Sequence, residues 1–126
     1  MPIKVVCAVI RREDRILICK RSSKMSHPDK WEFPGGKIQK HEKEEQALFR
    51  EIREELNIEV RIESKIGEFQ FSYPKKEICL IAFICSIESL KIVLSEHSNY
   101  KWIDLPDHEK YDWLAADLAI IEKLIK

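Results

Sequence analysis

Three glutamates lie close together in one polar stretch of the chain, at Glu51, Glu54 and Glu55. If residues 43–56 form a helix, at roughly 100° per residue, these side chains fall within one arc of about 100°. Carboxylates at this spacing repel one another, and a divalent cation would turn that repulsion into binding energy. Oxygen ligands suit Mg²⁺ or Mn²⁺ better than zinc. The spacing favours a metal site, and the plain alternative is a solvated helix whose glutamates pair with nearby basic side chains.

The helix that would carry these carboxylates has an apolar side next to the acidic one. Its apolar arc contains Leu48, Phe49, Ile52 and Leu56, so the acidic edge should lie close to the core. Ala47 falls within the acidic arc, where a methyl group leaves room for a ligand to approach the carboxylates.

The stretch from Gly36 to Ile58 resembles the Nudix box, G-x5-E-x7-R-E-U-x-E-E-x-G-U, in which U is aliphatic. The positions in register are Gly36, Glu42, Arg50, Glu51, Ile52, Glu54, Glu55 and Ile58. The box departs at Asn57, where the family has glycine, but asparagine is the second choice for the left-handed residue that ends a helix. His41 also stands where MutT-type members of the family commonly carry glycine. The residues before the box, WEFPGGK from Trp31 to Lys37, resemble the MutT-type sequence that leads into it.

This resemblance implies an enzyme that hydrolyses a nucleoside diphosphate linked to another group, with Mg²⁺ or Mn²⁺ as cofactor. It assigns the metal principally to Glu54 and Glu55, and Glu51 and the carbonyl oxygen of Gly35 join them. In such a reaction negative charge builds up on the phosphate oxygens, and divalent metal ions neutralise it. Several carboxylates are needed to hold these ions.

A carboxylate must also take the proton of the attacking water. Glu51 and Glu96 are the two candidates, and the sequence does not choose between them. Glu96 lies six positions before Trp102, and MutT-type members carry a further acidic ligand or base at that spacing. Arg50 is expected to orient the carboxylates through charge-assisted hydrogen bonds. Glu42 is expected either to support the metal ligands by hydrogen bonding or to bind a metal itself.

The MutT-type resemblance implies a nucleoside triphosphate substrate that is cleaved to a monophosphate and pyrophosphate. Arg21 stands where these enzymes have a basic residue facing the nucleotide, and Lys37 would project toward the phosphates. Asp117 occupies the position of a base-reading side chain, where an ionised carboxylate would accept a hydrogen bond from cytosine, adenine or a guanine-type base. Phe33 and Tyr73 could wall the base site. Each has a plain alternative. Arg21 could be a solvated cation at a strand end, and Asp117 a first-turn aspartate that complements a helix dipole. Phe33 and Tyr73 could simply pack against the sheet.

Two other functions stay open at this point. One is hydrolysis of a different linked diphosphate, such as a nucleotide sugar or a dinucleoside polyphosphate. The other is a non-catalytic nucleotide sensor, which the presence of every glutamate of the box disfavours.

The composition of the chain bounds its class. Its 126 residues predict one domain, residues 1–126. The 22 basic and 22 acidic residues balance, so no global field favours nucleic acid or an anionic membrane. No apolar run is long enough to span a membrane and no signal-peptide pattern is present, which predicts a cytoplasmic protein. The expected assembly is a monomer or a homodimer. The four cysteines stand singly in apolar runs, which is typical of reduced core residues.

The pattern of apolar residues predicts an α/β protein in which a mixed sheet is sandwiched between helices, and the resemblance implies that this is the α/β/α Nudix fold. A hairpin should turn at Glu13 and Asp14, and Gly67 should mark a bulge in a long, bent strand. The expected strands are residues 3–10, 16–19, 59–73, 78–87, 91–94 and 100–105, and the last helix is expected over 114–125.

Overall fold

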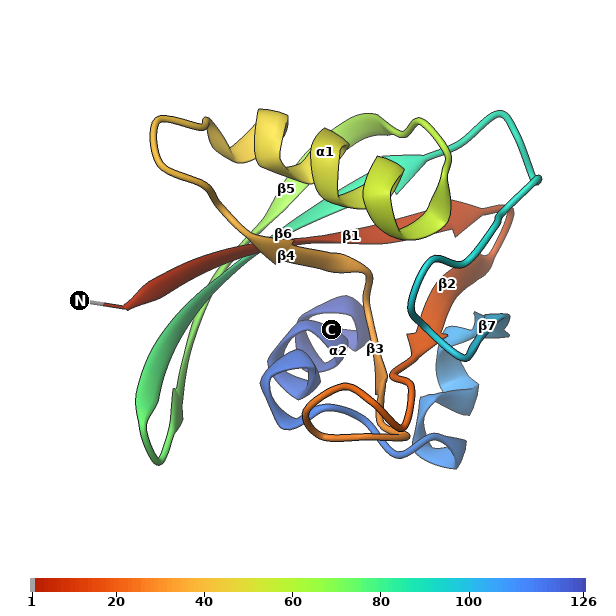
Figure 1. Ribbon diagram of the computed structural model, residues 1–126. Helices are drawn as coiled ribbons and strands as arrows, with labels where there is room; N and C mark the ends of the chain where they lie inside the picture. The colour runs from red at the N-terminus through yellow and green to blue at the C-terminus, as the bar shows by residue number, and fades with distance from the viewer. Residues whose placement is uncertain (1) are drawn as a thin grey trace.

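The computed structural model describes residues 2–126 as seven strands, two α-helices and two short 3₁₀ helices (Figure 1). The strands are β1 (Ile3–Arg12), β2 (Arg15–Lys20), β3 (Trp31–Glu32), β4 (Gly35–Lys37), β5 (Arg61–Tyr73), β6 (Lys76–Ser86) and β7 (Asn99–Asp104). The helices are α1 (Glu44–Leu56), η1 (Leu105–Lys110), η2 (Ala115–Asp117) and α2 (Leu118–Ile125).

Strand β1 is the centre of the sheet, whose order is β3-β2-β1-β6-β5. It runs parallel to β6 along most of its length and antiparallel to its other partners. One edge of β1 is shared, because β4 pairs with Val5–Cys7 and β2 pairs with Arg11 and Arg12. The two partners therefore pair with β1 at different places along the same edge.

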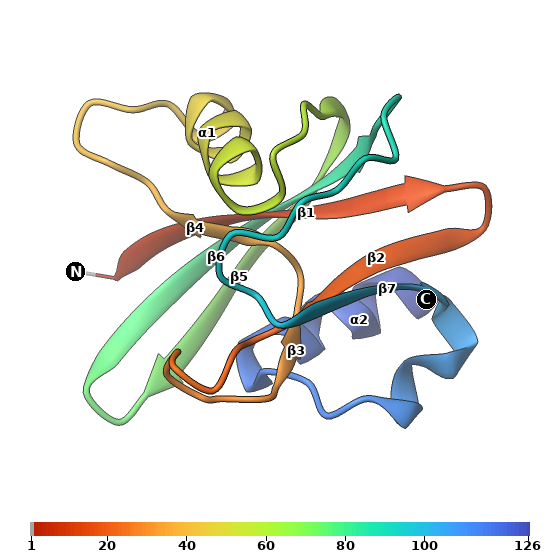
Figure 2. The same cartoon turned by 45° about the vertical axis from the view of Figure 1, so that its right-hand side comes forward.

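Alternate residues of β1 serve two cores, one on each face of the sheet. Val6 and Ala8 pack in the cluster that contains Leu48 and Ile52 of α1, whereas Cys7 and Val9 belong to the cluster that contains Ile120 of α2. Figures 1 and 2 show α1 and α2 on opposite faces of the sheet. The predicted sandwich of a mixed sheet between helices is confirmed, and a side-chain period of two in a strand is its physical basis.

The long strand β5 is bent as its sequence predicts. Its pairing with β6 shifts register between Ile62 and Ser64 and again between Lys65 and Gly67. Gly67, at the second shift, has φ of 158°, a backbone conformation that residues with a side chain rarely adopt, so the predicted bulge falls at the glycine.

Two predicted elements are wrong in part. Residues 91–94 form no strand, although their run of apolar side chains favoured one. The last helix begins at Leu118, and the turn before it is the 3₁₀ helix η2 rather than a continuation of the helix. None of the helices within residues 2–126 has the length and apolar character needed to cross a membrane.

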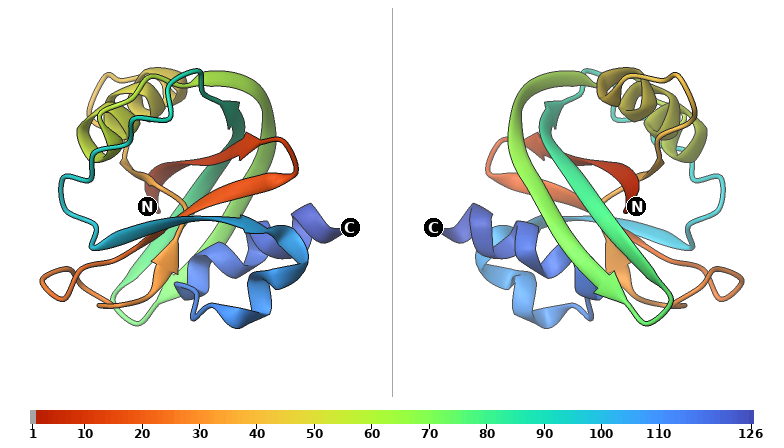
Figure 3. Two further views of the ribbon diagram at one scale, coloured as in Figure 1. Left: turned by 90° about the vertical axis from the view of Figure 1, so that its right-hand side faces the viewer. Right: turned by 90° about the vertical axis from the view of Figure 1, so that its left-hand side faces the viewer.

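The segment that was expected to be a strand caps the end of α1 instead. The carbonyl of Leu56 accepts a hydrogen bond from the Val93 amide at 3.0 Å, and that of Glu55 accepts one from the Ser95 amide at 3.1 Å. The Ser95 hydroxyl donates to the Glu54 carbonyl at 2.5 Å. The last carbonyls of a helix have no partner within it, and here a loop some forty residues further along the chain supplies the donors. Figure 3 shows this loop passing over the end of α1.

Candidate active site

Helix α1 presents two of the predicted glutamates to a cleft of about 400 Å³ beside β4. Glu51 and Glu55 are one helical turn apart and both line this cleft. The cleft also contains the predicted site residues Arg21, Gly35, Lys37 and Tyr73. Residues predicted from distant parts of the sequence thus meet in one place.

Glu55 is the most deeply placed of these carboxylates. The amide of Gly35 donates to its Oε1 at 2.8 Å. Burial raises its pKa to about 9, and the nearby charge of Glu32 adds to this, with smaller contributions from Glu51 and Glu96. A buried carboxylate among other carboxylates is stable as an anion only beside a cation.

Glu51 lies against the glycine turn that precedes the box helix. A Cβ placed on Gly36 would meet the carboxyl atoms of Glu51 at 2.3–2.6 Å. The other side of this carboxylate accepts a 2.8 Å hydrogen bond from Arg50 Nη1. The lack of a side chain at position 36 is therefore what lets Glu51 lie flat along β4.

Arg50 holds the start of the box to the helix. Its Nε and Nη2 donate to the two carboxylate oxygens of Glu42 at 2.7 and 2.9 Å, and Nη2 also donates to the Lys37 carbonyl at 3.0 Å. Its contact with Glu54 is longer, at 3.4 Å. The hydrogen bond from Arg50 is the main reason that the pKa of Glu42 falls to about 2. Both oxygens of Glu42 are occupied, so it supports Arg50 rather than facing the cleft.

The remaining two predicted carboxylates lie at the outer edge of the site. The side chain of Glu54 is 58% exposed, and Glu96 is exposed in the loop that caps α1. The bonds of Ser95 to the end of α1 bring Glu96 near Glu55, whose pKa it raises. Within residues 2–126 no group of three His, Cys, Asp or Glu side chains is arranged to hold a metal ion. The chemistry of the donors still fits one, because Glu51 and Glu55 both line the cleft and carboxylate oxygens suit a divalent cation that keeps water ligands.

A smaller pocket of about 70 Å³ joins the cleft and is lined by the three residues predicted to hold the base, Phe33, Tyr73 and Asp117. The Trp31 amide donates to the Asp112 carbonyl, and the Leu114 amide donates back to the Trp31 carbonyl, both at 2.8 Å. These bonds carry the chain into η2 and place Asp117 beneath Phe33.

Asp117 is buried, and its Oδ2 accepts a 2.8 Å hydrogen bond from the Phe33 amide. Burial raises its pKa to about 8, helped by the charge of Glu32, so the carboxyl group is mostly protonated at neutral pH. A protonated carboxyl group can donate a hydrogen bond as well as accept one. The sequence had suggested an ionised acceptor or a helix-dipole partner, and Asp117 makes no side-chain capping bond to α2.

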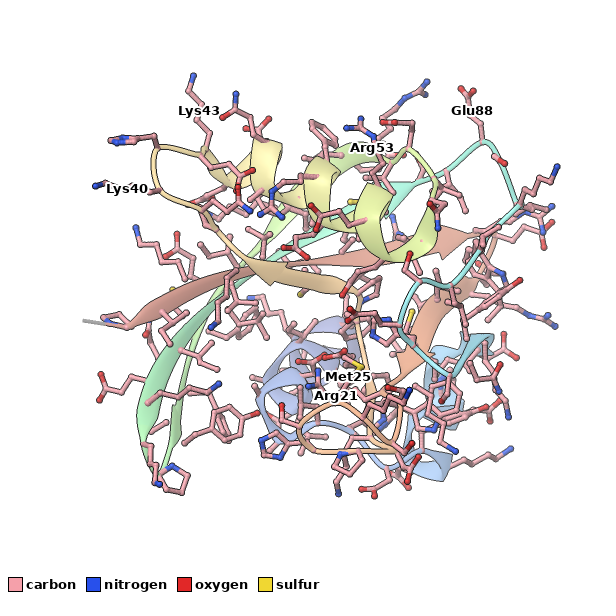
Figure 4. The ribbon with its side chains drawn as sticks, viewed as in Figure 1. Arg21, Met25, Lys40, Lys43, Arg53 and Glu88 are labelled. Atoms are coloured by element: carbon pink, nitrogen blue, oxygen red, sulfur yellow. The ribbon has the colours of Figure 1, made fainter. Side chains whose placement is uncertain are left out.

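Arg21 was expected to face the nucleotide, and it lines the cleft while staying tied to the protein. Its Nη1 donates to both oxygens of Glu32 at 2.9 and 3.0 Å. Its Nε and Nη2 bind the carbonyl and hydroxyl of Ser26 at 2.7 and 3.0 Å. All three nitrogens of its guanidinium group are thus bonded to the protein, and the loop over 21–30 is folded around it. Figure 4 shows Arg21 and Met25 together in this loop below α1.

A family model described as NUDIX domain matches residues 1–124. The chain belongs to the Nudix family. It is 32% identical over 120 residues to the CTP pyrophosphohydrolase of Escherichia coli (strain K12), covering 95% of this chain and 89% of that protein. It is also 32% identical over 126 residues to an 8-oxo-dGTP diphosphatase of Buchnera aphidicola, covering 97% and 92%. The crystal structure of a MutT protein from Methanosarcina mazei superposes with a TM-score of 0.87 at 28% identity, covering 97% and 92% of the two chains. The predicted MutT type of Nudix hydrolase is confirmed.

The two departures from the usual glycines of Nudix sequences adopt glycine-like backbone. His41 has φ of 69° and Asn57 has φ of 58°. Asn57 ends α1 in this left-handed conformation, as the sequence predicted. Its side-chain amide also donates to the Val93 carbonyl at 2.6 Å and to the Ser95 hydroxyl at 3.3 Å, contacts that glycine could not make.

Sequence reasoning missed several residues of this Nudix site. Glu32 accepts hydrogen bonds from Arg21 and lies within 2.8 Å of His97 Nε2. His27 stacks on Tyr73 with ring centroids 5.2 Å apart at the mouth of the cleft. Glu32 stood in the quoted WEFPGGK stretch and could have been considered, whereas neither histidine lies in a recognisable motif.

A more voluminous hollow of about 570 Å³ lies elsewhere, at the end of α1. It is lined by the exposed ion pairs Arg53–Glu59 and Arg61–Glu88, and Figure 4 shows Arg53 and Glu88 pointing outward there. It contains none of the predicted site residues. The smaller cleft beside Glu55 is therefore the better candidate, because charge and chemistry converge there.

Proposed function

We propose that this protein is a divalent-metal-dependent pyrophosphohydrolase of nucleoside triphosphates that releases a monophosphate and pyrophosphate in the cytoplasm. Its relatives named CTP pyrophosphohydrolase and 8-oxo-dGTP diphosphatase support a nucleotide substrate that includes modified bases. The cofactor is Mg²⁺ or Mn²⁺.

The observation that carries this proposal is the position of Glu55. It is a buried carboxylate with a raised pKa at the floor of a cleft, near Glu32, Glu51 and Glu96. Glu51, Glu54 and Glu55, with the carbonyl of Gly35, are the residues that would hold the metal. Bound there, it would neutralise phosphate charge and make the attacking water more acidic.

Three basic residues would bind the phosphates or hold the metal ligands in place. Lys37, exposed at the end of β4, offers its ammonium group to the phosphates. Arg21, held by Glu32, contributes positive charge to the same cleft. Arg50 keeps Glu51 in place through its 2.8 Å hydrogen bond.

The base would enter the pocket of Phe33, Tyr73 and Asp117. This pocket has about 70 Å³, well below the roughly 300 Å³ of an ordinary ligand site, so it must widen when a base binds. The ring of Tyr73 supplies a flat apolar wall. Asp117 presents a carboxyl group whose second oxygen is free of the Phe33 amide, and this edge would discriminate between bases.

Glu51 and Glu96 are the two candidates for the group that accepts the proton of the attacking water. Glu51 Oε1 already accepts a 2.8 Å hydrogen bond from Arg50 Nη1, which leaves this carboxylate less free to receive the proton of the water and suits it to hold the metal. Glu96 is exposed and faces no such cation among the contacts of the described residues. We therefore assign proton transfer to Glu96.

The test is a pyrophosphate-release assay with CTP, 5-methyl-dCTP, 5-hydroxy-dCTP, dGTP, 8-oxo-dGTP and dATP, in Mg²⁺ and in Mn²⁺. Wild-type protein should release pyrophosphate from at least one of them, and Glu55→Gln should lower kcat at least about 100-fold, in line with the loss of a metal ligand. Glu88→Gln is the matched control, because Glu88 is 90% exposed and far from the cleft.

Two results would overturn the proposal. One is retention of full turnover by both Glu54→Gln and Glu55→Gln. The other is the absence of pyrophosphate release from every triphosphate, which would direct the assay to nucleotide sugars and dinucleoside polyphosphates.

A further inference from the structure

His97 is a buried histidine beside the candidate site that the proposed reaction does not use. Its side chain is fully buried, and its Nε2 lies 2.8 Å from Glu32 Oε2. Because an ionised carboxylate can only accept, Nε2 must carry the proton and donate it. Of the buried side-chain nitrogen and oxygen atoms in residues 2–126, only His97 Nδ1 has no hydrogen-bond partner.

The segment that contains His97 is held at both ends, with Glu96 between the two anchors. On one side, the amide and hydroxyl of Ser95 bind the carbonyls at the end of α1. On the other side, His97 binds Glu32, and the amide of Ser98 donates to the Lys20 carbonyl at 2.9 Å. The first anchor ties Glu96 to the helix that carries Glu55, and the second ties it to β3.

We propose that His97 is a positioning residue for Glu96. Its hydrogen bond to Glu32 fixes the backbone on the distal side of Glu96 and thereby holds that carboxylate near Glu55. This inference rests on the proposed function only where it gives Glu96 a part in the reaction.

Packing alone does not explain a histidine here. An apolar side chain of similar size would fill the same buried space without leaving a ring nitrogen unpaired, and buried polar atoms without partners are rare in native proteins. Glu32 does not depend on His97 for neutralisation either, because Arg21 already binds both of its oxygens. What His97 alone provides is a directional link between β3 and the residue next to Glu96.

The test compares His97→Leu with His97→Gln. The amide nitrogen of glutamine lies the same number of bonds from Cβ as Nε2 of histidine, so His97→Gln keeps a donor for Glu32, whereas His97→Leu keeps only apolar bulk. We expect His97→Leu to lower kcat 10- to 100-fold, as outer-sphere partners and small misplacements do, with KM for the nucleotide within about twofold. His97→Gln should recover kcat to within about threefold of wild type.

A double-mutant cycle with Glu96→Gln separates positioning from general stability. If His97 acts through Glu96, His97→Leu should lower kcat no further when Glu96 is already Gln. Independent effects that multiply in the double variant would overturn the proposal, and so would a Glu96→Gln variant with wild-type kcat. His108→Leu is the matched control, because His108 lies on η1, beyond the end of β7 remote from Lys20.

A second readout does not need turnover. Mn²⁺ affinity of the free protein, followed by calorimetry, should fall to a similar extent in His97→Leu and Glu96→Gln, while thermal melts show both folded. If wild type hydrolyses no nucleotide, the proposed function fails and this comparison alone decides. Reduced Mn²⁺ affinity in Glu96→Gln with wild-type affinity in folded His97→Leu would refute the positioning role. If His97→Leu does not fold, His97→Gln decides. A folded His97→Gln whose kcat is 10-fold or more below that of wild type would refute the proposal.

Discussion

The side-chain amide of Asn57 donates a 2.6 Å hydrogen bond to the carbonyl of Val93, so the residue that ends the box helix also holds the loop that carries Glu96. Its left-handed backbone, with φ of 58°, is what aims the amide at that loop. A glycine would adopt this backbone more easily but would lose the side-chain bonds to the loop.

Replacing Asn57 separates these two effects. Asn57→Gly removes left-handed strain and loses the side-chain bonds, each worth about 1 kcal/mol, so its stability should stay within about 1 kcal/mol of wild type. Asn57→Ala keeps the strain and loses the bonds, and should be about 2 kcal/mol less stable. In both variants the Val93 and Ser95 amides should exchange faster with deuterium. Wild-type stability in Asn57→Ala would show that the bonds contribute nothing.

The adjacent glycines of β4 should respond differently to alanine. At Gly36 the new methyl group meets the carboxyl end of Glu51, a flexible group that can move aside, so unfolding should change by less than about 1 kcal/mol while kcat falls at least tenfold. At Gly35 it meets the Val6 carbonyl oxygen at 1.9 Å, which is backbone, and destabilisation of about 3 kcal/mol is expected. Denaturant unfolding and the pyrophosphate assay together check both. Equal losses of stability would mean that Glu51 is as rigid as the strand.

Asp117 should make the protein less stable as the pH rises. Its pKa is about 8 when folded and about 3.9 in an unfolded chain. Between these values the folded protein holds a proton that the unfolded chain releases, so the free energy of unfolding falls as pH increases from about 4 to about 8. Asp117→Asn removes this contribution and should be more stable than wild type by a few kcal/mol at pH 8.5, but not at pH 4. Denaturant unfolding at the two pH values measures it, and parallel pH profiles would contradict it.

Removal and addition of metal should reverse the stability order of wild type and Glu55→Gln. Without divalent ions, Glu55→Gln should be the more stable protein at neutral pH, because the pKa of Glu55 is about 9 in the folded protein and folding must therefore give it a proton that it lacks in the unfolded chain, a cost that a neutral amide does not have. Mg²⁺ at about 100 times its Kd should stabilise wild type by about 2.7 kcal/mol and the variant by much less. Thermal melts in EDTA and in Mg²⁺ test this, with Glu88→Gln expected to respond as wild type does. Equal responses of wild type and Glu55→Gln would place the metal elsewhere.

The parts of the fold that sequence predicted well are those set by nearby residues. Local sequence patterns placed the hairpin turn at Glu13 and Asp14 and the bend of β5 near Gly67, and the helix supposed over residues 43–56 is α1. The apolar run in residues 91–94 resembled that of a real strand. Whether such a run pairs depends on a free strand edge nearby, and here the unpaired carbonyls at the end of α1 bind it instead.

The candidate site was predictable where the box or a position of the MutT-type pattern marks a residue. Glu51 and Glu55 lie in the box, whereas Glu32 and His97 are 65 residues apart and no spacing rule connects them. Arg21 was identified by position, but its four bonds to Glu32 and Ser26 could not be, because they depend on how the loop over 21–30 folds around it. Buried polar partnerships of this kind are a property of the tertiary structure.

The attachment of the loop to α1 also decides where the chain tolerates a change of length. Residues 88–91 are exposed and make only peripheral contacts, such as that between Arg61 and Glu88, so an inserted or deleted residue there would be absorbed at little free-energy cost. From Val93 to His97 each second residue is fixed, Val93 and Ser95 to α1 and His97 to β3. A single insertion in that span would break the register between the two anchors and rotate Glu96 away from Glu55.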